Sequence, residues 1–181
     1  MARDVRYFAY GTLQTGFPNH GAFADDLGAG LGRYRTVEPY PLVVPLQSAC
    51  ANPGCRFVHR MCALLPDAGT GLPVEGELFA VDPATIERLD RLESYRADDE
   101  AGSAYLRREV RVAPLDQDDE PVDAQVYFVA AVAAWRRLLE RGEAEVVARY
   151  TKDLAVGPLK ECCRREPGHP GPHDVIDLVS P

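Results

Sequence analysis

The sequence predicts an α+β fold built on a mostly antiparallel sheet or a small barrel. The chain has 181 residues, of which 46% are apolar, so one domain with a substantial hydrophobic core is expected. Segments with strand character outnumber segments with helical periodicity. The two kinds do not alternate along the chain, which disfavours a parallel sheet with helical crossovers.

In the first half of the chain, residues rich in aromatic and β-branched side chains predict short strands. We expect them at residues 5–10, 36–44 and 57–65. Between the first two, a short helix is expected over residues 20–27, with Asn19 as its N-cap. Pro39 and Pro41 indicate that the second extended segment lies at an edge or bends.

The middle of the chain carries the clearest signals. Residues 74–81 alternate apolar with polar or small residues, which is typical of a strand with one buried face. Asp82 followed by Pro83 is a helix start, and we expect the helix to continue to about Glu93. Two further strands, at residues 105–112 and 125–131, flank an acidic turn and predict a hairpin.

Towards the C-terminus the pattern changes twice. Residues 133–153 have the periodicity of an amphipathic helix, with Gly142 as a weak point. The last 25 or so residues contain five prolines, so we expect an irregular tail from residue 154 to residue 181.

Charge and composition narrow the classes of function. The net charge is −8, from 28 acidic and 20 basic residues, which disfavours nucleic-acid binding and favours action on small molecules. No apolar leader or long apolar span is visible, so we expect a cytoplasmic protein that does not enter a membrane.

The first candidate for a binding element is the turn Tyr10-Gly11-Thr12-Leu13, which follows the first strand. Gly11 has no Cβ to keep a ligand away from the backbone. A row of backbone N–H groups in such a turn is a suitable anion site. Ordinary β-turns share this pattern, so the turn alone leaves a purely structural role open.

The second candidate is Glu93. At 100° per residue it lies in the apolar stripe that Ile86, Leu89 and Leu92 define on the predicted helix. A carboxyl group that faces the core has a raised pKa, as a general base near neutral pH requires. The alternative is that Glu93 lies at a frayed helix end and faces water. Asp90, on a neighbouring face, is a candidate partner for an arginine.

These segments together resemble the γ-glutamylcyclotransferase-like family, and within it the γ-glutamylamine cyclotransferases. The resemblance spans most of residues 5–128 and comprises five ordered blocks. The blocks are Tyr10-Gly11-Thr12-Leu13 with Gly16, Asn19 and His20; Glu38-Pro39-Tyr40-Pro41-Leu42-Val43; Val74-Glu75-Gly76-Glu77 with Val81-Asp82; Leu89-Asp90 with Glu93; and Tyr105 with Arg107.

The resemblance implies a small β-barrel flanked by helices over residues 1–153. It also implies that Glu93 is the catalytic base and that the backbone of Tyr10 to Leu13 holds the glutamyl α-carboxylate, with Tyr105 lining the site. The implied reaction releases 5-oxoproline and a free amine from a γ-glutamyl amide, without metal or organic cofactor. The cysteines in residues 47–62, the long loop 94–104 and the tail depart from the family pattern.

Three alternatives remain open from the sequence. Cysteines and histidines cluster twice, at Cys50, Cys55, His59 and Cys62 and at Cys162, Cys163, His169 and His173, so a metal-stabilised protein is one alternative. The spacings match no zinc motif. A cysteine hydrolase that uses Cys62 with His59 is a second alternative, and a non-catalytic protein that binds γ-glutamyl compounds is a third.

Overall fold

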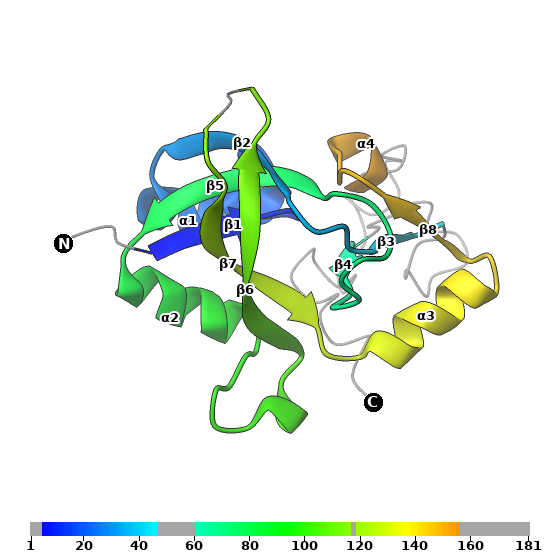
Figure 1. Ribbon diagram of the computed structural model, residues 1–181. Coiled ribbons are helices and arrows are strands. Elements are labelled where there is room, and N and C mark those ends of the chain that lie inside the picture. The colour runs from blue at the N-terminus through cyan, green and yellow to red at the C-terminus, as the bar shows by residue number, and fades with distance from the viewer. Residues whose placement is uncertain (1–4, 47–60, 117–118, 156–181) are drawn as a thin grey trace, which may run out of the picture.

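The computed structural model describes residues 5–46, 61–116 and 119–155, and its centre is a closed five-stranded barrel (Figure 1). The strand order is β1-β5-β2-β6-β7. These strands are β1 (Val5–Ala9), β2 (Gly30–Thr36), β5 (Glu75–Val81), β6 (Tyr105–Pro114) and β7 (Val122–Val129). Every neighbouring pair is antiparallel except β1 with β7, whose parallel contact closes the barrel. The predicted α+β fold with a small, mostly antiparallel barrel is confirmed.

A second, three-stranded sheet stands beside the barrel, in the order β4-β3-β8 (Figure 1). Its strands are β3 (Leu42–Pro45), β4 (Ala63–Leu64) and β8 (Ala144–Val147). Helix α3 (Val132–Glu140) covers this sheet and buries Trp135 in a cluster with Val43 and Leu65.

The other helices are α1 (Pro18–Leu27), α2 (Pro83–Leu92), the 3-10 turn η1 (Glu100–Gly102) and the short α4 (Lys152–Ala155). Helix α2 buries Ile86 and Leu89 against Tyr7, Phe79 and Tyr127 of the barrel wall. Burial of one such aliphatic side chain contributes about 1.5–3 kcal/mol, so this face fixes α2 on the barrel. No helix in the described part of the chain has the length and apolarity needed to cross a bilayer.

The barrel interior is filled by alternate residues of its strands, including Phe8, Leu78 and Val126, none of which is exposed to solvent. Gly76 permits the close approach of β5 to β1, because a Cβ at this position would collide with the carbonyl oxygen of Ala9 and the ring of Phe8. The expected strand at residues 74–81 is therefore a central strand of the barrel.

Three details differ from the sequence predictions. Phe17, rather than Asn19, is the N-cap of α1, and the Asn19 side chain donates a hydrogen bond to Thr12 Oγ1 (2.9 Å). Strand β2 was not expected, because its residues are largely exposed and show no apolar alternation. The expected helix over residues 133–153 is divided among α3, β8 and the start of α4, since the chain turns at Gly142 (φ 67°) and continues as β8 along β3.

The predicted domain boundary after residue 153 lies inside α4. Residues 156–181, which make up most of the predicted tail, are outside the described residues, as are the expected strand residues 57–60.

Candidate active site

Glu93 lies at the C-terminal end of α2, and the chain fixes both ends of this helix. At the start, Asp82 is the N-cap, as predicted, and its carboxylate accepts a hydrogen bond from the Thr85 N–H (2.7 Å). At the end, Glu93 is the C-cap residue and its N–H donates to the Leu89 carbonyl (2.9 Å).

The two residues after Glu93 close the helix with a Schellman motif. Ser94 adopts the left-handed conformation (φ 50°) and its N–H donates to the Arg91 carbonyl (3.3 Å). The Tyr95 N–H returns to the Asp90 carbonyl (2.8 Å). Tyr95 also packs in the same cluster as Leu89. Glu93 is therefore held at a locked helix end, and the alternative of a frayed end is wrong.

Glu93 is half-buried among aromatic side chains. Burial raises the pKa of its carboxyl group from 4.5 to about 7. No described residue forms a side-chain hydrogen bond with this carboxyl group. Five titratable side chains face it closely enough for its charge to raise their pKa values, namely Tyr7, Tyr10, Cys62, Tyr105 and Tyr127. Burial is the main cause of all five shifts, so these groups stay neutral near pH 7.

The turn that ends β1 contributes to the same region. Within the described residues, the backbone N–H groups of Gly11, Thr12 and Leu13 donate to no acceptor. A Cβ built on Gly11 would lie 3.2 Å from Cys62 Sγ, so this turn and the Cys62 side chain are in contact. Three successive amides that have no partner among the described residues are the feature on which the predicted anion site depends.

The side chains of the turn point away from this row of amides. The Tyr10 hydroxyl donates to the Tyr127 carbonyl (2.7 Å), Thr12 Oγ1 accepts from Asn19, and Leu13 is buried in the cluster under α1 and α2. Gln14 braces the turn by donating to the Tyr10 carbonyl (2.8 Å). The turn's own polar side chains therefore leave its amides unoccupied, while Tyr10 and Cys62 border the same region.

Tyr105 begins β6 and faces both Glu93 and Cys62, and no hydrogen bond to a described residue occupies its hydroxyl. The sequence analysis did not identify four other residues as neighbours of Glu93 or of its partners: Tyr7, Cys62, Tyr127 and Tyr150. The pKa of Tyr150 is raised by burial and then by Cys62 and Tyr105, so its hydroxyl is close to theirs. They come from four segments far apart in the sequence, and Cys62 and Tyr150 lie outside the strands, so no local pattern could have revealed them.

The cysteine alternatives are weakened. Burial raises the pKa of Cys62 well above its usual value, so the group is a thiol near neutral pH and a poor nucleophile. His59, its proposed partner, and all other cysteines lie outside the described residues. Within the described ranges, no group of three or more His, Cys, Asp or Glu side chains is arranged to hold a metal ion.

Two surface hollows lie near these elements without including Glu93. One, of about 350 Å³, lies beside the turn and is lined by Gln14, Thr15 and Lys152 among others. The other, of about 360 Å³, lies beside α2 and is lined in part by Asp90 and Arg107. Neither hollow is lined by Glu93 or by the turn of Gly11 to Leu13. We therefore take the region around Glu93 as the candidate active site.

Comparison with known proteins agrees with this geometry. The family model described as "Gamma-glutamyl cyclotransferase, AIG2-like" matches residues 7–145, which is more than half of the chain. The chain belongs to this family. The matched range includes the turn, Glu93 and Tyr105.

Several relatives of this family member are similar over the same region. Human gamma-glutamylaminecyclotransferase is 38% identical over 112 residues, which are 60% of this chain and 62% of the human protein. The bovine gamma-glutamylaminecyclotransferase is 35% identical over 126 residues, 68% of this chain and 64% of that protein. The match thus spans less than two thirds of either relative. An AIG2-like protein from Mus musculus, solved by crystallography, superposes with a TM-score of 0.59 at 29% identity, covering 81% of this chain and 88% of that chain.

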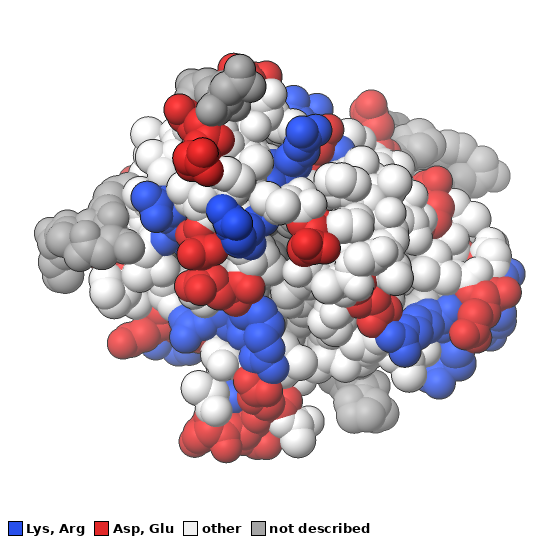
Figure 2. Space-filling model, viewed as in Figure 1, with Lys and Arg blue, Asp and Glu red and all other residues white. Residues whose placement is uncertain are grey.

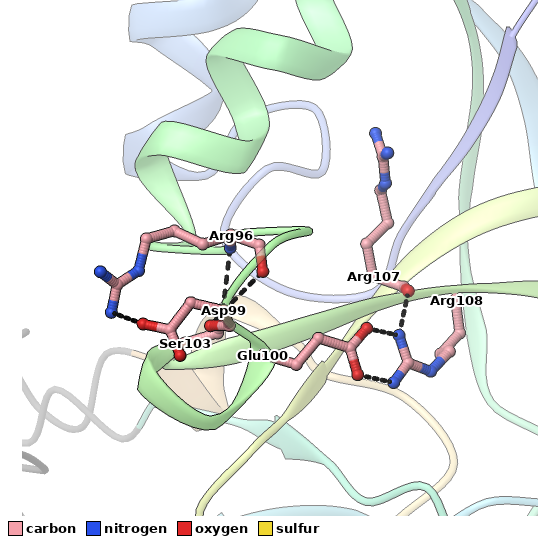
Figure 3. Close-up of polar contacts among 6 residues, drawn as sticks. All are labelled: Arg96, Asp99, Glu100, Ser103, Arg107 and Arg108. Carbon is pink, nitrogen blue, oxygen red and sulfur yellow. Dashed lines mark hydrogen bonds and ion pairs between the residues drawn. The ribbon is translucent and has the colours of Figure 1, made fainter.

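The loop between α2 and β6 carries three acidic residues close to Glu93 in the sequence, but arginines pair with two of them (Figure 3). Asp99 pairs with Arg96 (2.9 Å), and Glu100 accepts two hydrogen bonds from Arg108 (2.7 Å each). The Arg108 hydrogen bonds lower the pKa of Glu100. Basic and acidic side chains are also interspersed on the face drawn in Figure 2. An acidic loop next to the base would favour substrates that release a cationic amine, but these arginines pair with two of its three acidic residues.

Proposed function

We propose that this chain is a γ-glutamylamine cyclotransferase-type enzyme. It releases 5-oxoproline and a free amine from a γ-glutamyl amide by intramolecular aminolysis. The observation that carries the proposal is the carboxyl group of Glu93, which has a pKa of about 7, in a region that also holds the amides of Gly11 to Leu13. Neither this carboxyl group nor these amides have a hydrogen-bond partner among the described residues.

In this proposal the amides of Gly11, Thr12 and Leu13 bind the substrate α-carboxylate. That contact turns the adjacent α-ammonium group towards Glu93, which removes a proton. The free amine attacks the γ-carbonyl carbon, so a C–N bond forms and closes a five-membered ring. The bond from that carbon to the leaving nitrogen then breaks as protonated Glu93 gives its proton to that nitrogen. The ring nitrogen loses its second proton to the departing amine, so the products are the lactam 5-oxoproline and an ammonium ion.

Both reacting groups belong to one substrate molecule, so orientation is the main contribution that the protein makes. The pKa of about 7 suits both halves of the cycle, because the carboxylate can accept a proton near neutral pH and the acid can release it again. Tyr105, whose hydroxyl has no hydrogen-bond partner among the described residues, is proposed to line the substrate site. No step needs a metal or an organic cofactor.

The test is a panel of γ-glutamyl amines and γ-glutamyl peptides assayed for 5-oxoproline. We expect release from at least one γ-glutamyl amine and a loss on the order of 10²–10⁴-fold in Glu93→Gln. Glu87→Gln is the matched control, since Glu87 lies on the exposed face of the same helix. Tight binding of γ-glutamyl compounds without turnover would support the non-catalytic alternative. Full activity of a folded Glu93→Gln protein would exclude Glu93 as the base.

A further inference from the structure

One hydrogen-bonded network joins the helix end that carries Glu93 to the turn that carries the free amides. Tyr127 of β7 is its centre. Its hydroxyl donates to Asp90 Oδ1 (2.8 Å), three residues before Glu93 on α2. Its backbone carbonyl accepts the hydroxyl of Tyr10 (2.7 Å), the first residue of the turn.

Arg107 of β6 completes the network from the other side of Asp90. Its Nη1 lies 3.2 Å from Asp90 Oδ2, so both carboxylate oxygens of Asp90 have partners. The Arg107 guanidinium also lies over the ring of Tyr95, 5.4 Å from its centroid. Tyr95 is the residue whose N–H closes the helix end on the Asp90 carbonyl. Asp90 is thus held through its side chain and its backbone.

We propose that Asp90, Arg107 and Tyr127 are positioning residues that hold Glu93 at a fixed place relative to the Gly11–Leu13 turn. The inference rests on the proposed function, because it assigns these residues to the geometry of the same site. None of the three needs to touch the substrate. Their effect is to keep the base and the carboxylate-binding amides at one separation, on which intramolecular aminolysis depends.

The position of the network in the structure argues against a mainly stabilising role. The side chains of Asp90 and Arg107 are 20% and 26% exposed, and partly exposed ion pairs contribute little to global stability. Helix α2 is already fixed by Ile86 and Leu89, which are buried on the barrel wall. The last turn of α2 lies beyond Ile86 and Leu89, and the network fixes the orientation of this turn through Asp90.

The experiment compares Tyr127→Phe, Asp90→Asn and Arg107→Ala with the parent protein. Two arginines that lie near the network but outside it serve as controls. Arg108 follows Arg107 on β6 but its side chain binds Glu100 on the other side of the strand (Figure 3). Arg88 lies on α2 but pairs with Asp26, away from the site. We expect kcat to fall about 10- to 100-fold in the three network variants. KM should change less, and Arg108→Ala and Arg88→Ala should keep parental kinetics.

Two further readouts separate positioning from folding. Arg107→Lys should recover part of the loss, since an ammonium group can still pair with Asp90. The double variant Tyr127→Phe/Asp90→Asn should lose no more than the worse single variant, because both act through one network. Equal activity of the network variants and the controls would overturn the proposal. So would losses that simply follow the melting temperature.

A third readout does not depend on turnover. NMR titration of the Glu93 carboxyl carbon should give a pKa near 7 in the parent. It should give a lower value in Tyr127→Phe, which changes no charge, because a loosened helix end admits water. Five titratable side chains face Glu93: Tyr7, Tyr10, Cys62, Tyr105 and Tyr127. All five stay neutral near pH 7, so their titration does not mask the shift in the Glu93 pKa. A lowered pKa in a protein without 5-oxoproline release would support the network while refuting the proposed function. If the parent protein releases 5-oxoproline and the Glu93 pKa is unchanged in the variant, the positioning role of the network is refuted while the proposed function stands.

Discussion

Replacing Glu93 by glutamine is expected to make the protein more stable at neutral and alkaline pH while it removes activity. The pKa of this carboxyl group rises from 4.5 to about 7 on folding, because burial disfavours the charged form. At about 1.4 kcal/mol per pKa unit, the ionised group costs the folded state on the order of 3 kcal/mol. The residue is partly exposed, so this value is an upper bound.

The sign follows from proton binding. The folded protein holds the Glu93 proton more tightly than the unfolded chain does. Its contribution to stability is therefore fully present below pH 4.5 and is lost as pH rises through about 7. Glutamine does not ionise, so the difference between Glu93→Gln and the parent should be small at pH 4.5, grow up to pH 7, and level off by about pH 8.

Thermal unfolding followed by circular dichroism between pH 4.5 and 9 measures this difference. For a domain of this size, 3 kcal/mol corresponds to a rise in Tm of roughly 6–12 °C at pH 8. Glu87→Gln, on the exposed face of the same helix, controls for the change in net charge. The acid limb of kcat/KM in the parent should titrate near the same pH. A Glu93→Gln protein that is less stable than the parent at pH 8, or whose advantage does not vary with pH, would refute the argument that this carboxyl group is desolvated.

Three other predictions concern the surroundings of the base. Gly11→Val should abolish measurable turnover in a folded protein, because its added Cβ would press on Cys62 Sγ and its branches would cover the amides. Substrates with an amidated α-carboxylate should fail in the parent, because they lack the negative charge that the amides are proposed to bind; equal turnover of amidated and free-acid substrates would give the turn a structural role only. Cys62 should resist alkylation by iodoacetamide at pH 7 in the native protein, because burial keeps it a thiol. Peptide mass spectrometry measures the modification, and a rate equal to that of the unfolded chain would contradict the prediction. Neutralising Asp98, Asp99 and Glu100 together should change the preference between cationic and anionic leaving amines by less than about threefold at low salt, since arginines already pair with two of them. A larger loss of preference for cationic amines would show that the charge of the loop selects the leaving amine.

Local signals in the sequence were sufficient where a residue's partners lie within a few positions of it. The Asp82 cap, the start of α2 at Pro83 and the burial of Ile86 and Leu89 all depend on contacts within one or two helical turns. The pairing of β6 with β7 was also predictable, because only a short acidic turn separates the two strands. The same locality explains the error after Glu140, where helical periodicity continued in the sequence but β3 offered an unpaired edge to residues 144–147.

The sequence by itself determined the fold class, the turn with its glycine, and Glu93 as the residue of α2 whose charge falls on an apolar face. Only the tertiary structure decided that Glu93 is desolvated, because its neighbours Tyr7, Cys62, Tyr105 and Tyr127 come from four separate segments. The pKa of a carboxyl group depends on what excludes water from it, and side chains remote in sequence do so here. The parallel contact of β1 with β7, which closes the barrel, brings Tyr7 next to Tyr127.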